Sequence, residues 1–140
     1  MPYEDEEPPY VEPDAELDSL ARAVIGAAIE VHRQLGAGLD ESLYRNALCV
    51  ELRNANISFA KEVIIDVTYK GEVIGTKRID FIVGGRLIVE LKAVESLAPL
   101  HSAQVRTYLK ITRLKLGLLI NFNVPILKDG IKRIINPSAF

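Results

Sequence analysis

Residues 79–94, IDFIVGGRLIVELKAV, place three charged side chains inside two otherwise apolar runs: Asp80, Glu90 and Lys92. A Gly-Gly pair separates the runs and is typical of a β-hairpin turn. Each run is therefore predicted to be a strand deep in a sheet. A charge buried there costs several kcal/mol unless it is paired or bound to a metal ion, so these three charges need an explanation.

The length of the hairpin loop decides whether the three charges meet. Side chains alternate between the two faces of a strand, so Glu90 and Lys92 share one face. A three-residue loop pairs Val83 with Leu87 and sets Asp80 opposite Glu90. A two-residue loop leaves Glu90 on the wrong face. We predict the three-residue loop, or an equivalent bulge.

Two carboxylates held opposite each other repel, and a divalent cation between them relieves the repulsion. Their oxygens are the hard ligands that suit Mg²⁺ or Mn²⁺. Such an ion polarises a phosphoryl oxygen and lowers the pKa of a bound water. Lys92 can orient that water, help to deprotonate it, or neutralise the charge that develops on the phosphate. The pattern predicts metal-dependent phosphodiester hydrolysis; the alternative is a buried Glu90–Lys92 ion pair with Asp80 at a sheet edge.

Two helical patterns carry further polar candidates. Glu41 and Tyr44 share a face near the start of one predicted helix. The Glu41 carboxylate could reach the metal, directly or through water, or it could be a solvated first-turn acid. His101, Gln104 and Tyr108 form a stripe on a later helix, where Gln104 could hold the water or a phosphate oxygen. For this stripe a solvated face is the alternative.

Hydrophobic periodicity predicts helices around the strands. Residues 17–35 repeat apolar side chains every three or four positions, and Gly36 ends this helix. A second helix follows Asp40, a possible N-cap. Its inward-facing candidates include Leu43, Ala47, Val50 and Leu52.

The remaining elements alternate in a way that defines the fold class. Strands are predicted over 61–69, 72–83, 86–94 and 114–122, a helix over 98–113, and a turn with a final short strand over 128–135. The order α-α-β-β-β-α-β favours an α/β fold in which helices cover a sheet.

Charge is distributed unevenly along the chain. Residues 1–18 hold eight acidic side chains and no basic one, so the other 122 residues carry a net charge of +6 although the whole chain carries −2. A basic body suits a polyanionic partner, but +6 is also ordinary for a domain. The candidates for phosphate contact are Arg86, Arg106, Lys110, Arg113 and Lys115. A solvated cationic helix end explains the 106–115 run equally well.

Composition excludes several classes of protein. No apolar run approaches the ~20 residues of a membrane span. Residues 1–16 are acidic and Pro-rich, unlike a signal peptide, and we expect a disordered arm there before a domain over 17–140.

Cys49 is the single cysteine, which fits a reducing cytoplasm and a small core residue. His32 is expected to be a hydrogen-bonded packing residue. Aromatic residues make up only 6% of the chain, which disfavours a single-strand binder that relies on base stacking.

Five motifs in order carry a resemblance to a known family. GLDESLY fits the pattern G-x-x-E-x-x-Y at Gly38, Glu41 and Tyr44, and RIDFIV, IVELKAV, HSAQVRTYL and KLGLLINF follow it. Together they resemble the GxxExxY family, small members of the PD-(D/E)XK nuclease superfamily, over about residues 24–133. Each motif alone is weak, but five in the right order at similar spacing are a strong signal.

The resemblance implies a restriction-endonuclease-like α-β-β-β-α-β core, with a mixed central sheet flanked by helices and a Mg²⁺ or Mn²⁺ site at its centre. The metal ligands expected are Asp80, Glu90, Glu41 and the main-chain carbonyl of Leu91, and the catalytic residues expected are Lys92, Gln104 and Glu41. Ile79 stands where the superfamily commonly has Pro before its metal-binding Asp.

These observations together predict a cytoplasmic, metal-dependent nuclease that acts on DNA more than on RNA. The expected nucleic-acid contacts are Arg86, Arg106, Tyr108 and Lys110. A homo-oligomer or a partner is expected to supply specificity. The alternative is a non-catalytic module that keeps the nuclease fold as an assembly subunit or a nucleic-acid binder.

Overall fold

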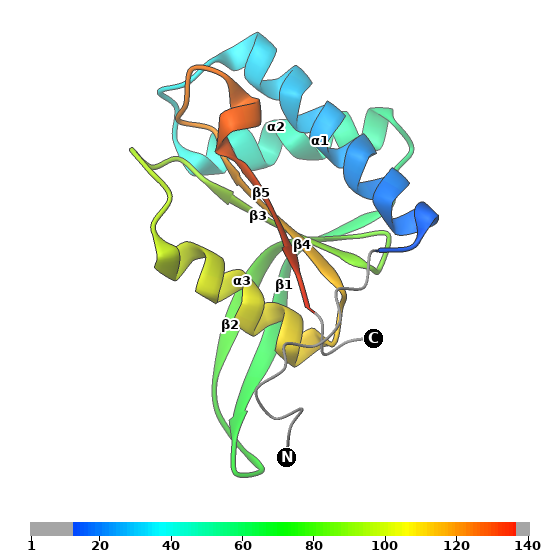
Figure 1. The fold of residues 1–140 in the computed structure, drawn as a ribbon, viewed down its shortest axis with the longest axis vertical. Helices are drawn as coiled ribbons and strands as arrows, with labels where there is room; N and C mark the ends of the chain where they lie inside the picture. Colours follow the sequence, from blue (N-terminus) through cyan, green and yellow to red (C-terminus); the bar gives the residue numbers. More distant parts are fainter. Residues whose placement is uncertain (1–12, 137–140) are drawn as a thin grey trace, which may run out of the picture.

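Within residues 13–136, five strands form one mixed sheet in the order β1-β2-β3-β4-β5 (Figure 1). The strands are β1 (Phe59–Tyr69), β2 (Glu72–Val83), β3 (Leu87–Lys92), β4 (Leu116–Asn121) and β5 (Ile131–Ile135). Strands β3 and β4 run parallel, and the other neighbours run antiparallel. The computed structural model describes residues 13–136. The helices are α1 (Ala15–Leu35), α2 (Glu41–Asn54) and α3 (Pro99–Thr112), with a 3₁₀ turn η2 (Leu127–Gly130) before β5.

Helices cover both faces of the sheet. Helices α1 and α2 lie over one face and α3 over the other (Figure 1). The larger core cluster, under α1 and α2, includes Val24, Leu48, Phe81, Val89 and Leu118. The smaller cluster, under α3, includes Ile79, Ile88, Val105, Leu109 and Leu119. This arrangement confirms the predicted α/β fold and its element order. Within residues 13–136, no helix combines the length and apolarity that a membrane crossing requires.

Helix α1 begins and ends at residues suited to those positions. The Asp14 side chain accepts a hydrogen bond from the Leu17 N–H at 2.9 Å, which satisfies a donor that the first turn leaves open. Gly36 ends the helix at a φ of +69°, in the left-handed region that glycine adopts readily. The helix thus starts two residues before the predicted domain boundary. The disordered arm predicted before that boundary falls mainly on residues 1–12, which lie outside the described residues.

Helix α2 turns a different side to the core than the sequence predicts. Its buried residues are Tyr44, Leu48, Cys49 and Leu52. Leu43 and Val50 are each 46% exposed, so the prediction that both point inward is wrong. The burial of Leu52 and Cys49 confirms the predictions for those two residues.

Tyr44 explains how α2 is rotated. Its hydroxyl donates to the Gly36 carbonyl at 2.6 Å and accepts from the Leu39 N–H at 3.1 Å. Its ring stacks on Phe122, with ring centroids 4.5 Å apart. These contacts fix the loop between α1 and α2 and turn the Tyr44 side of the helix toward the core. His32, near the end of α1, is hydrogen-bonded as predicted, through Nε2 to the Val124 carbonyl at 2.8 Å.

The β2–β3 hairpin has the predicted register. Val83 pairs with Leu87, and the Arg86 N–H donates to the Val83 carbonyl at 3.1 Å. Gly84 and Gly85 both have positive φ, at +58° and +69°, which a residue with a side chain adopts only under strain. The three-residue loop is therefore confirmed.

At Asp80, the side chains of strand β2 stop alternating regularly between the two faces of the sheet. Phe81 and Val83 pack under α1 and α2, whereas Ile79 packs under α3, although strict alternation would put all three on one face. Across the sheet, Glu62 on β1 has a φ of +52°, and the regular pairing of β1 with β2 omits Glu62 and Asp80. Asp80 therefore lies where the strand turns over, and the far part of the β1–β2 hairpin extends away from the rest of the sheet (Figure 1).

Candidate active site

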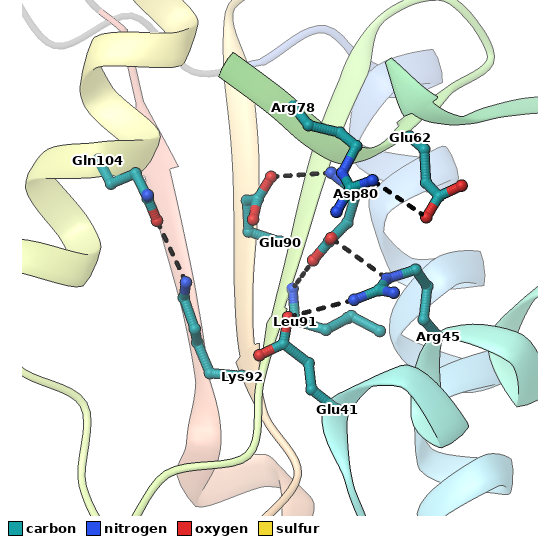
Figure 2. Close-up of polar contacts among 9 residues, drawn as sticks. All are labelled: Glu41, Arg45, Glu62, Arg78, Asp80, Glu90, Leu91, Lys92 and Gln104. Atoms are coloured by element: carbon teal, nitrogen blue, oxygen red, sulfur yellow. Dashed lines mark hydrogen bonds and ion pairs between the residues drawn. The ribbon is translucent and has the colours of Figure 1, made fainter. Parts of the chain in front are cut away.

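The Asp80 and Glu90 carboxylates take over hydrogen bonding between β2 and β3. The Asp80 N–H donates to Glu90 Oε1 at 2.9 Å, and the Leu91 N–H donates to Asp80 Oδ2 at 2.8 Å (Figure 2). The regular pairing of the two strands ends one residue earlier, at Phe81 and Val89. Each carboxylate is thus fixed against the neighbouring strand, and the two acidic side chains lie together.

Both carboxylates are buried, with 8% of Asp80 and 4% of Glu90 exposed. Burial raises the pKa of Glu90 to about 8, and the neighbouring charge of Asp80 raises it in the same direction. The Asp80 N–H and the Lys92 ammonium oppose this rise in pKa. Without a metal ion, the raised pKa favours the protonated form of Glu90. A cation bound by the pair would displace that proton.

Lys92 lies on the same face of β3 as Glu90 and points toward α3. Its Nζ donates to Gln104 Oε1 at 3.2 Å (Figure 2). Both side chains are half-buried. The structure thus brings together four of the predicted site residues: Asp80, Glu90, Lys92 and Gln104.

Asn121, which sequence analysis did not single out, fixes the chain just after Lys92. Its side chain is 1% exposed and binds both main-chain groups of Val94, accepting from N–H at 3.0 Å and donating to C=O at 2.9 Å. The Phe122 N–H also donates to the Lys92 carbonyl at 2.9 Å. The end of β3 is therefore tied to β4. A polar residue at the end of a buried apolar strand is the sequence signal for this role.

Arg45 stands between Glu41 and Asp80. Its Nε lies 3.3 Å from Asp80 Oδ1, and its Nη2 lies 3.5 Å from Glu41 Oε1 (Figure 2). Sequence analysis missed Arg45, although a Glu followed four residues later by Arg is a favourable helical pair. Glu41 therefore reaches Asp80 through the guanidinium. Within residues 13–136, no three His, Cys, Asp or Glu side chains gather into a metal-binding group, so the direct ligand role of Glu41 stays a prediction.

The hydrogen bonding of the Arg45 guanidinium is incomplete. Nε is buried and, within the described residues, makes no hydrogen bond of good geometry, even though it lies close to Asp80. The guanidinium still places a positive charge beside a buried carboxylate. Such a charge offsets part of the cost of burying Asp80.

The predicted nucleic-acid contacts are spread over the molecule. Arg86, beside the β2–β3 turn, forms an ion pair with Asp14, and the guanidinium holds the pKa of that carboxyl well below its usual range. Tyr108 is 3% exposed, and burial raises its pKa; its contact with nucleic acid stays a prediction. Arg106 and Lys110 are exposed on α3.

The residues at the site fit a divalent metal ion. Asp80 and Glu90 supply two carboxylates, and a carboxylate that accepts one hydrogen bond keeps further lone pairs for a ligand. Carboxylate and carbonyl oxygens are the donors that Mg²⁺ and Mn²⁺ prefer. The main-chain carbonyl of Leu91 remains a predicted third donor.

A comparison with protein families shows which family the chain belongs to. A family model described as the PD-(D/E)XK nuclease superfamily matches residues 18–134, so the chain belongs to that superfamily. Its members are generally phosphodiesterases that use divalent metal ions.

Of the other two comparisons, one finds no match and the other supports the fold alone. A search of the curated proteins finds no significant match. Among solved structures, the crystal structure of SSO0001 is similar, with a TM-score of 0.50 and 22% sequence identity over 88% of this chain. The present chain spans 59% of the length of SSO0001.

Proposed function

We propose that this protein is a Mg²⁺- or Mn²⁺-dependent nuclease that hydrolyses phosphodiester bonds in nucleic acid, in DNA more than in RNA. The observation that carries the proposal is the pair of hydrogen bonds from the Asp80 N–H to Glu90 and from the Leu91 N–H to Asp80, which holds two carboxylates together next to Lys92. Membership of the nuclease superfamily supports the same class of reaction. The five ordered motifs support a place in its GxxExxY family.

Asp80 and Glu90 would hold the metal ion, with the Leu91 carbonyl and Glu41 as further candidates. When bound, the ion supplies a Lewis acid that polarises a phosphoryl oxygen and lowers the pKa of water. Metal binding requires Glu90 to release its proton, because the pKa of Glu90 is raised to about 8 when no metal ion is bound. We therefore expect metal binding to strengthen as the pH rises toward that value.

Lys92 would act on the water or the phosphate. Its ammonium can orient the attacking water, help to deprotonate it, or neutralise negative charge on the phosphate. Gln104 accepts one of its N–H bonds, which limits the directions that the ammonium takes. Gln104 is therefore a positioning residue for Lys92 in this proposal.

The partners follow from charge and exposure. The net charge of +6 outside residues 1–18 supports binding to a phosphate backbone, and exposed Arg106 and Lys110 on α3 are candidates for the contacts. Exposed Leu43 and Val50 on α2 support a homo-oligomer.

The single, reduced Cys49 supports a cytoplasmic location.

A cleavage assay tests the proposal. Plasmid and single-stranded DNA are incubated with wild type, Asp80→Ala or Lys92→Ala in Mg²⁺, Mn²⁺ or EDTA. We expect cleavage that requires the metal ion and falls roughly 100-fold or more in each variant. Asp66→Ala and Lys132→Ala are matched controls, because both side chains are exposed and take no part in the described site.

The melting temperature of each variant shows whether it is folded. Cleavage in EDTA, or full activity in folded Asp80→Ala, would contradict the proposal. Folded wild type that binds DNA but cleaves none with either ion would favour the non-catalytic module instead.

A further inference from the structure

A cavity lies directly beside Lys92, between α3 and the β1–β2 hairpin. Its volume is about 420 Å³, which falls within the roughly 300–1,000 Å³ of small-molecule sites. Its lining includes Val67, Lys77, Lys92, Leu100, Gln104 and Tyr108. The cavity therefore shares Lys92 and Gln104 with the candidate active site and extends from there toward the hairpin.

The lining has an uneven chemistry. Most of its surface is apolar, and Val67 and Leu100 supply aliphatic walls. Two ammonium groups also border it, from Lys77 and Lys92, and no acidic residue does. Lys77 is exposed and forms no ion pair with another residue in 13–136, so its charge is available to a ligand. A ligand complementary to this lining combines an anionic group with a body that can lie against apolar side chains.

We propose that the cavity takes one unpaired nucleotide of the substrate strand, with its phosphate at Lys77 and Lys92 and its base against Val67 and Leu100. The inference rests on the proposed nuclease function and names its substrate class. A base inside a duplex is stacked and paired, so it enters such a cavity only when single-stranded or flipped out. The favoured substrate is therefore a single strand or a frayed end.

The low aromatic content is compatible with this assignment. A protein that coats single strands without sequence preference uses several aromatic platforms in a row. The cavity instead holds a single base against Val67 and Leu100, beside the point where the nucleic-acid strand is cut. It selects unpaired substrate by shape and charge at one position.

A binding titration tests the cavity without involving metal or cleavage. Thymidine 5′-monophosphate is added to the full-length ¹⁵N-labelled protein in EDTA, and amide shifts are followed by NMR. We expect saturable shifts at residues 67, 77, 92 and 100–108, with binding at least about fivefold weaker for deoxyribose 5-phosphate, which has no base, and for thymidine, which has no phosphate. Equal affinity for all three ligands, or no saturable shift, overturns the inference.

Two variants locate the bound nucleotide. Lys77→Gln removes one phosphate contact, and Leu100→Asp puts a negative charge on an exposed part of the wall, so neither should impair folding. We expect each to weaken nucleotide binding about tenfold, whereas Lys132→Gln on β5 leaves it unchanged. Unchanged binding in both cavity variants overturns the inference.

Substrate preference separates this inference from the proposed function. We expect a single-stranded oligonucleotide to be cut at least about tenfold faster than the same sequence in a blunt duplex, because only the former supplies an unpaired base. Metal-dependent cleavage with equal rates on both would overturn the inference and leave the nuclease proposal intact. Nucleotide binding in the cavity without cleavage of any substrate would overturn the nuclease proposal alone.

Discussion

Glu90 is an acid whose protonation changes strongly on folding. Its pKa rises from 4.5 to about 8, first because it is buried and then because Asp80 lies beside it. Between these two values the folded protein keeps a proton that the unfolded chain releases. The free energy of unfolding therefore falls as the pH rises through this range.

We predict that the melting temperature of metal-free protein falls as the pH is raised from about 5 to about 8. Glu90→Gln should remove most of this fall in melting temperature, because the glutamine amide does not titrate in this pH range. Calorimetry in EDTA at several pH values measures both slopes. An unchanged slope in Glu90→Gln would show that another group controls the pH dependence.

Arg45 places a positive charge where a metal ion would also place one. We predict that Arg45→Gln tightens Mn²⁺ binding roughly tenfold, because the guanidinium beside Asp80 repels a cation. The same change should lower the melting temperature of metal-free protein, because Asp80 loses its buried partner. Electron paramagnetic resonance of free Mn²⁺ measures the affinity. Arg53→Gln, which removes an exposed charge from the same helix, is the control; weaker Mn²⁺ binding in Arg45→Gln alone would reject this role.

Sequence analysis identified three charged residues on one hairpin, and it identified Gln104 on α3 from a polar stripe along a helix. Asp80, Glu90 and Lys92 stand out because charge is rare in an apolar strand, and side-chain alternation together with the hairpin register relates them. Arg45 and Asn121 were missed because their partners lie far along the chain. Nothing in local spacing shows that an arginine on α2 reaches a carboxylate on β2.

At the scale of elements, α3 lies very close to the sheet at Gly117. A Cβ at this position of β4 would lie 2.7 Å from Val105 Cγ1. Val105 is β-branched and fully buried, so it has few rotamers with which to move away. Glycine at this position therefore permits the distance at which α3, and with it Gln104, sits above β3.

We predict that Gly117→Ala lowers the free energy of unfolding by about 1–3 kcal/mol, through overpacking. Gly26→Ala is the matched control. Gly26 lies exposed in α1, and a Cβ there meets nothing within 4 Å, so alanine should raise stability by about 0.5–1 kcal/mol. Urea denaturation measures both changes. Equal effects of the two substitutions would argue against close packing of α3.

Element order and the β2–β3 register followed from the sequence, whereas two orientations did not. The Gly84–Gly85 turn and the apolar runs around it determine the hairpin locally. The rotation of α2 depends on Tyr44 stacking on Phe122, a contact between distant segments. The change of face of β2 at Asp80 coincides with a left-handed conformation at Glu62 on β1, which a residue with a side chain rarely adopts.

In the fold as a whole, the site lies at an opening in the sheet, where the regular pairing of β2 with β3 ends. Regular pairing of β2 with β3 stops just before Asp80 and Glu90, so side chains from both layers of helices reach the same place. Arg45 comes from α2 on one face and Gln104 from α3 on the other (Figure 2). The sequence predicted a sheet covered by helices, but only the structure shows that the two layers meet at this opening.

We expect Asp80 and Glu90 together to hold one divalent cation. Anomalous diffraction from crystals soaked in Mn²⁺ tests it most directly, with crystals of Asp80→Ala as the comparison. We predict a single peak within coordination distance of both carboxylates in wild type and none there in the variant. A wild-type map without a peak at these carboxylates, from crystals in which both side chains are ordered, would contradict the account.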